Sequence, residues 1–295
     1  MRKNWSLCLE AMAIAGLLLG ACSIAAAQGG QSSQSGQGGQ SQPPAPPPDK
    51  SKTPDVTPLT LDAAPPVNAD EDAAFKAFQT LLLTDPKKIE TGEAFLQKYP
   101  ESRYRSPVYG ALVYAYVQAG QVQKMQEYGE KEIALVPNDV TTLALMAQTL
   151  PRSIRTSTTP AEAAQLLAKA EQYSKQAIEI TPTIPKPPAM TDDQFTSAKN
   201  QNLAMAHSGL GLVYFRRGKN AEAITELDEA VKIDPSPDQV NYYLLGLANK
   251  GASHFDDAIA AFNKCSAMPG QMQAICKAQA DDTKKKSATE LSAPK

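Results

Sequence analysis

The chain has 295 residues, with 29 basic and 31 acidic side chains and a formal net charge of −2. This balance excludes the strongly basic surface by which proteins bind nucleic acid or an anionic membrane. Residues 28–69 contain almost no large apolar side chains, so this segment is predicted to be a disordered tether. Residues 70–280 are numerous enough to bury a continuous core.

Residues 1–27 are predicted to be an export signal. Arg2 and Lys3 supply the positive end, and the apolar run over residues 11–27 is too short and too rich in alanine for a convincing membrane-spanning helix. The segment contains two competing cleavage sites, and an uncleaved membrane anchor is the third alternative. The small residues before Gln28 fit cleavage after Ala27 by ordinary signal peptidase.

The second cleavage site ends at Cys22. The residues Leu-Gly-Ala-Cys at 19–22 resemble a bacterial lipobox, which implies that Cys22 becomes the lipidated first residue. The Gln/Gly/Ser and polyproline tether that follows favours the lipid anchor, because a soluble secreted protein has less need of a spacer. The predicted location is therefore the periplasmic face of a bacterial membrane, or the soluble periplasm if the chain is cleaved after Ala27.

Helices are predicted from residue 70 onward. Asp70 and its acidic neighbours suit a helix start, and Phe75 and Phe78 follow at helical spacing. Pro86 begins a second helix that runs to Pro100. Residues 106–137 form a second helix pair with Gly120 at its turn.

The middle of the chain has longer connections. A short helix is predicted over 140–150, and residues 151–160 are predicted to be a loop. Thr159 is placed to cap the following helix, which ends near Pro182. The proline-rich segment 183–189 cannot be helical, and Asp192 or Asp193 starts the next long helix.

Residues 207–235 carry a distinctive order of small and bulky positions. The next segment repeats part of it, because Gly211 to Ala223 and Gly246 to Ala258 both span twelve residues. This order resembles the tetratricopeptide repeat (TPR), a helix-turn-helix unit of about 34 residues. The positions that carry the resemblance are Leu210, Gly211, Tyr214, Gly218, Ala223, Leu227, Ala230 and Pro235.

The resemblance implies an all-α solenoid of paired helices over 70–280, with the best repeats at 204–237 and 239–270. In the pair at 106–137, Met125, Gly129 and Glu132 depart from the repeat pattern, and we expect looser packing there. Residues 272–280 are predicted to be a capping helix that covers the last repeat. Residues 281–295 are predicted to be a disordered tail.

Catalytic chemistry is not indicated. The two histidines, His207 and His254, are interpreted as a packed or rim residue and a solvated residue. The metal motifs HExxH and CxxC, the phosphate-binding GxGxxG and the nucleophile motif GxSxG are absent from the folded segment. Adjacent aspartates on a helix point about 100° apart and cannot share a proton. The sequence therefore predicts no enzyme activity, no metal and no cofactor.

Cys265 and Cys276 are the two cysteines outside the signal region. In an oxidising periplasm they could form a disulfide that fastens the capping helix to the last repeat. The alternative is a pair of small, buried, reduced side chains.

The TPR resemblance implies a protein or peptide partner in the groove lined by the first helices of successive repeats. Its predicted lining is largely apolar, which suits an amphipathic helix or extended peptide, although the same residues could instead pack against adjacent helices. The predicted positions are Met205, Ser208, Leu212, Phe215, Val240, Tyr243, Leu247 and Lys250.

The TPR clamp for chaperone tails is absent, because Ser208, Leu212 and Leu244 replace its Lys and Asn residues. The predicted function is a non-enzymatic interaction scaffold in the bacterial envelope. The alternatives are a self-assembling or complex-bracing subunit and, with least support, an enzyme or small-molecule binder.

Overall fold

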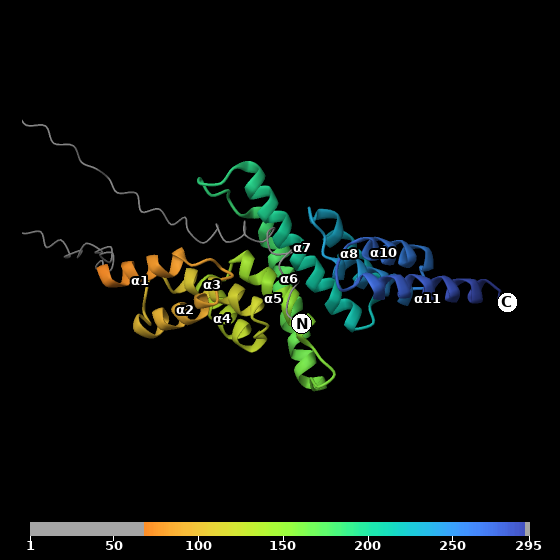
Figure 1. Ribbon diagram of the computed structural model, residues 1–295, viewed down its shortest axis with the longest axis horizontal. Coiled ribbons are helices and arrows are strands. Elements are labelled where there is room, and N and C mark those ends of the chain that lie inside the picture. Colours follow the sequence, from red (N-terminus) through yellow and green to blue (C-terminus); the bar gives the residue numbers. More distant parts are fainter. Residues whose placement is uncertain (1–67, 293–295) are drawn as a thin grey trace, which may run out of the picture.

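The computed structural model describes residues 68–292, and the secondary structure of this part of the chain is all helical, as the sequence predicted. The predicted signal, Cys22 and most of the tether lie outside the described residues. Figure 1 shows the helices following one another from one end of an elongated molecule to the other. The helices are α1 (Ala69–Thr80), α2 (Lys87–Lys98), α3 (Arg105–Gln118), α4 (Val122–Leu135), α5 (Val140–Ser153), α6 (Pro160–Ile180), the 3-10 turn η2 (Thr181–Thr183), α7 (Asp192–Arg216), α8 (Asn220–Ile233), α9 (Gln239–Gly251), α10 (Phe255–Ala267) and α11 (Gln273–Ser292).

The helices pack as sequential pairs, α1 with α2 through α9 with α10, and each second helix also packs against the first helix of the next pair. This arrangement confirms the predicted α-solenoid. Small residues set the spacing within pairs. A Cβ atom on Gly211 would lie 2.6 Å from Cγ of Leu227, and one on Gly246 would lie 2.5 Å from the ring of Phe262.

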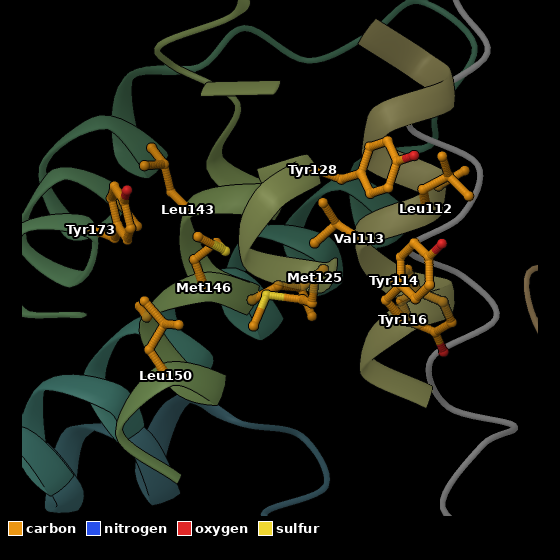
Figure 2. Packing of buried hydrophobic residues seen from close by; sticks show 14 of the residues in the cluster. Leu112, Val113, Tyr114, Tyr116, Met125, Tyr128, Leu143, Met146, Leu150 and Tyr173 are labelled. Carbon is orange, nitrogen blue, oxygen red and sulfur yellow. The ribbon is translucent and has the colours of Figure 1, made fainter. Parts of the chain in front are cut away.

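The largest core cluster joins α1 to α7, and α3 and α5 contribute the most residues to it. Figure 2 shows Met125 of α4 and Met146 of α5 pointing into the same space. Met146 also explains the departure at Gly129, because a Cβ there would lie 2.5 Å from its Sδ atom. The bulky side chain missing from α4 is thus replaced by one from the next helix, and Met125 and Met146 are both fully buried.

Glu132 occupies a position where the repeat pattern favours alanine, and it is 1% exposed. The Ser106 hydroxyl donates a 2.7 Å hydrogen bond to its Oε1 atom, whereas Oε2 has no hydrogen-bond partner among the described residues. Burial therefore raises the pKa of Glu132 to about 7. The helix pair is therefore not loosely packed at Glu132, as the sequence had led us to expect. Instead, the folded state carries the cost of burying one carboxyl group.

The prediction of a loop from residue 151 is wrong, because α5 continues through Pro151 to Ser153. Proline has no amide hydrogen, so Ala147, four residues earlier, loses its usual helical donor. Gly209 of α7 lies against this same carbonyl, and a Cβ atom on Gly209 would overlap it. The freed carbonyl and the glycine thus let α5 and α7 approach closely.

The predicted helix starts in the middle of the chain are confirmed. Thr159 caps α6, since its hydroxyl accepts a 3.2 Å hydrogen bond from the amide of Glu162. Helix α7 begins at Asp192, where Thr191 and Gln194 form a capping box. The proline-rich residues between η2 and Thr191 have no regular helix.

The predicted end of the ordered domain at residue 280 is wrong, because α11 continues to Ser292. Thr283 is fully buried, so the helix still packs against its neighbour beyond the predicted boundary. The sequence there is charged because the other sides of α11 face solvent: Asp281, Asp282 and Lys284 are exposed. The charged residues after 280 therefore belong to the exposed side of an amphipathic helix and not to a disordered tail.

Candidate protein-interaction site

The structure divides the eight predicted groove residues into three groups. Ser208 and Leu212 of α7 are buried, with exposures of 0% and 5%, so neither is available to a partner in this arrangement. Leu212 packs in the cluster between α7, α8 and α9. Both side chains therefore contact adjacent helices, which was the alternative to a role in the groove.

Ser208 belongs to a polar network centred on Arg152, at the end of α5. Arg152 Nη2 donates to Ser208 Oγ and to Asn241 Oδ1, each at 3.0 Å. Its Nη1 atom forms a 3.0 Å ion pair with Asp238, the N-cap of α9. Ser208 itself donates to Asn241 at 2.6 Å. One guanidinium group therefore links three successive first helices, α5, α7 and α9.

A second group turns toward the C-terminal end of the array. Tyr243 and Leu247 pack against the cluster that contains Phe262 and Ala280. Lys250 donates to Gln279 at 3.0 Å and to Asp282 at 2.6 Å, and both acceptors lie on α11. These three residues therefore help to dock α11.

The third group consists of Met205, Phe215 and Val240, which are half-buried. Met205 packs against the large cluster, while Phe215 and Val240 pack against the same smaller cluster from α7 and α9. Part of each side chain still reaches solvent. These three predicted groove residues keep accessible apolar surface and pack on clusters that contain no residue of α11.

Residues at the ends of α5 and α7 were missed by sequence reasoning. Of the seven arginines in the sequence, four fall in two short segments, at 152–155 and 216–217. Arg155 donates to the carbonyl of Arg152 at 2.8 Å, and Arg216 donates to the carbonyl of Ile154 at 3.3 Å. We call this region, made of Arg152, Arg155, Arg216 and Arg217, the arginine edge. The clustering of arginine at two helix ends was the signal that could have revealed it.

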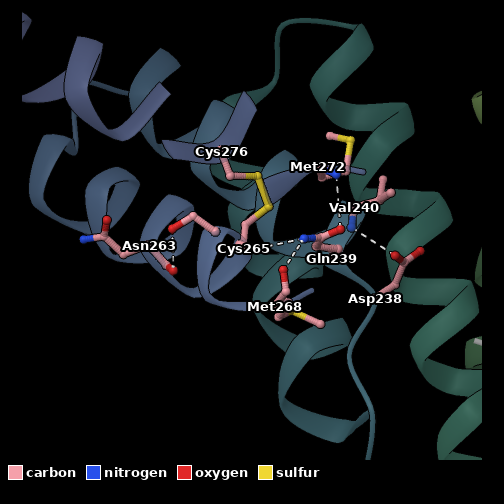
Figure 3. The surroundings of a disulfide bond; sticks show 9 residues. Asp238, Gln239, Val240, Asn263, Cys265, Met268, Met272 and Cys276 are labelled. Atoms are coloured by element: carbon pink, nitrogen blue, oxygen red, sulfur yellow. Dashed lines mark hydrogen bonds between the residues drawn. A yellow bond between two sulfur atoms is a disulfide. The ribbon is translucent and has the colours of Figure 1, made fainter. Parts of the chain in front are cut away.

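Cys265 of α10 and Cys276 at the start of α11 form a disulfide, with a Cα–Cα distance of 5.8 Å. Figure 3 shows Gln239 of α9 beside it. The Gln239 amide donates to the carbonyls of Cys265 and Met268, at 3.0 and 2.8 Å, and its Oε1 atom accepts from the amide of Met272 at 3.3 Å. The disulfide and this side chain both fix the connection between α10 and α11.

His207 pairs with Glu226 of α8, with 2.7 Å between Nδ1 and Oε2, which is a contact within one helix pair. In the part of the chain that the structure describes, no three His, Cys, Asp or Glu side chains are grouped to hold a metal ion. Over the same residues, none of the helices combines the length and apolarity needed to cross a membrane.

A family model for the TPR repeat matches residues 211–251. This segment covers the end of α7, all of α8 and α9, and thus the close contact of Gly211 with Leu227. Residues 211–251 therefore match a TPR repeat, in the segment where the order of small and bulky residues predicted one. Repeats of this kind generally act as scaffolds for protein–protein interaction.

Several solved structures are similar to the chain, and two of them are TPR proteins of bacteria. One is a thermophilic TPR protein of Thermus thermophilus, with 15% identity, a TM-score of 0.48, and coverage of 72% of this chain and 98% of that chain. The other is a tetratricopeptide repeat protein from Parabacteroides merdae, with 14% identity, a TM-score of 0.35, and coverage of 72% and 90%. No curated protein sequence matches the chain.

Proposed function

We propose that the protein is a non-enzymatic scaffold that binds another polypeptide across α7 and α9, beside the arginine edge. The observation that carries this proposal is the pair Phe215 and Val240, which lie on successive first helices, share one cluster and retain accessible apolar surface. The Arg152 network holds these helices in a fixed relation. A surface that is already ordered loses less entropy when it binds.

Site-specific crosslinking tests this proposal. A photo-crosslinking amino acid in place of Phe215 or Val240 should give a discrete polypeptide adduct when cells that express the protein are irradiated. Leu82 is the matched control, because it is a large apolar residue, 73% exposed, in the connection between α1 and α2. Adducts from Leu82 alone, or from none of the three positions, would contradict the scaffold function.

We also propose that the protein is exported and held at the periplasmic face of a bacterial membrane by a lipid on Cys22. The N-terminal sequence supports this location, and the disulfide between Cys265 and Cys276 suits an oxidising compartment. Cys22→Ala should abolish labelling by a palmitate analogue and release the protein from the membrane fraction. Unchanged labelling would remove the anchor, and a mature chain that starts at Gln28 would instead support cleavage after Ala27.

A further inference from the structure

The arginine edge contains two cations that have no acidic partner among the described residues. Arg152 is paired with Asp238 and Arg217 is paired with Glu171. Arg155 and Arg216 form no ion pair with any residue from 68 to 292, and both side chains are exposed. In a chain whose net charge is −2, two neighbouring unpaired guanidinium groups are a local excess of positive charge.

Arg155 and Arg216 come together although they lie far apart in the sequence. Their hydrogen bonds end on carbonyls of Arg152 and Ile154, which belong to the same last turn of α5 and its cap. The pKa of Arg216 is lowered, first by desolvation and second by the charge of Arg155. The fold therefore holds two guanidinium groups that repel each other at the end of α5.

Capping of α5 accounts for only part of their hydrogen-bonding capacity. The carbonyls at a helix C-terminus carry about half a negative charge in total, whereas the two arginines carry two positive charges. Each guanidinium has five N–H donors, and each is seen to use one. In addition, Nε of Arg152 is buried without a hydrogen-bond partner among the described residues.

The surroundings distinguish between an acidic peptide and a small anion. Ile154 directly precedes Arg155, Phe215 directly precedes Arg216, and both apolar side chains are half-buried. A small anion could pair with the guanidinium groups but would leave this apolar surface uncovered. A polypeptide segment with carboxylates and apolar side chains matches both features.

We propose that the arginine edge binds an acidic segment of the partner polypeptide, with carboxylates paired to Arg155 and Arg216 and an apolar side chain against Phe215. This inference rests on the scaffold function and identifies the chemistry of its partner. Planar bidentate pairing of arginine with carboxylate makes the contact specific as well as attractive. Asp238 and Glu171 are already engaged, because they pair with Arg152 and Arg217, the other two arginines of the edge.

Fluorescence anisotropy with the purified full-length protein tests the proposal. The probe is a labelled peptide in which glutamates alternate with alanine and valine, and its neutral counterpart carries glutamine in place of glutamate. The double variant Arg155→Gln/Arg216→Gln should bind the acidic peptide about tenfold or more weakly, because two charge-assisted contacts are lost. Binding of the neutral peptide should be weak and should not change between the proteins.

The control is Lys76→Gln/Lys87→Gln, which removes the same charge from exposed side chains of α1 and α2. It should keep the affinity for the acidic peptide within about twofold, since these lysines lie in the first helix pair and not at the edge. Circular dichroism checks that the variants are folded. If the double variant unfolds, Arg155→Gln alone decides the question, and it should still weaken binding severalfold.

Three results would overturn the inference: equal affinity of the double variant, equal affinity for the neutral peptide, or a preference for a labelled single-stranded oligonucleotide over the acidic peptide. The scaffold function is tested separately by the Phe215 and Val240 crosslinks. Adducts at those positions together with a failed peptide test would remove only the acidic partner. Peptide binding without any adduct would leave a charged site but remove the scaffold.

Discussion

At the scale of single residues, the contact of α5 with α7 depends on a glycine that the repeat resemblance did not single out. Gly209 lies against the carbonyl of Ala147, which lacks a helical donor because Pro151 follows four residues later. The approach of α5 and α7 brings Ser208 within reach of Arg152. The polar network between the first helices therefore depends on the absence of one methyl group.

Substitution of this residue tests the contact. Gly209→Ala should destabilise the protein by about 1–3 kcal/mol, because a Cβ atom would overlap main-chain atoms that cannot rotate away. Gly251→Ala is the matched control, because there the Cβ would meet only the flexible side chain of Asn220. The control should be neutral or slightly stabilising, since alanine favours helix. Urea unfolding measures both, and equal stability of the two variants would contradict the close-approach argument.

Glu132 should make stability depend on pH. Its pKa is about 7 in the folded protein against an ordinary value of 4.5, so between these values the folded state holds a proton that the unfolded state has lost. Stability should therefore fall as pH rises from about 4.5 to 7, by about 3 kcal/mol at most. Glu132→Gln mimics the protonated form and should lack this part of the loss.

Urea unfolding at pH 5 and pH 8 measures the effect of Glu132. Burial also raises the pKa of Asp139, which acts in the same direction in both proteins, so the difference between parent and variant is the informative quantity. Glu179→Gln is the control, because this carboxylate is exposed on α6. An identical pH dependence of parent and Glu132→Gln would contradict the assignment.

At the scale of secondary-structure elements, α11 is an unusual cap. Apart from Gln279, its buried or half-buried residues recur at helical spacing and are small: Cys276, Ala280, Thr283 and Ser287. Small side chains bury little apolar area, so the hydrophobic contribution to docking is modest. The helix must therefore depend on specific contacts, which are the disulfide to Cys265 and the bonds from Lys250 to Gln279 and Asp282.

Removal of the disulfide should consequently loosen α11. The cysteines are 11 residues apart, and a loop of this length corresponds to roughly 3 kcal/mol of stabilisation at most. Cys265→Ser/Cys276→Ser should lower the free energy of unfolding by up to that amount. Amide exchange should accelerate mainly in α11, while α5 and α7 keep their protection. Uniform acceleration along the chain would contradict a local role for the bond.

At the scale of the whole molecule, stability should vary along the array. In a linear stack each unit contacts only its neighbours, so end units have one interface where inner units have two. The structure follows this expectation: α5 and α7 each pack on several neighbours, whereas α1 packs mainly on α2. The fully buried large side chains are concentrated in the inner helices, and α5 by itself contributes three of them, Leu143, Met146 and Leu150.

Hydrogen exchange with mass spectrometry should therefore show a gradient. Amides of α5 and of the second half of α7 should exchange most slowly, and those of α1 should exchange fastest among the helices. The Phe75–Tyr104 stack, with ring centroids 4.0 Å apart, connects α1 to the residue before α3, so Phe75→Ala should release α1 without affecting α7. Equal protection of α1 and α5 would contradict the linear stack.

The sequence by itself determined the paired helices, most of the helix starts and the small residues at Gly211 and Gly246, because these depend on patterns within a few turns of one helix pair. It also singled out Cys265 and Cys276. Only the tertiary structure decided that Ser208 and Leu212 are buried, that Met146 fills the space at Gly129, and that Arg155 and Arg216 both bond to the end of α5. These outcomes depend on how successive pairs lie against one another, and residues far apart in the chain set that geometry together, so no local pattern records it.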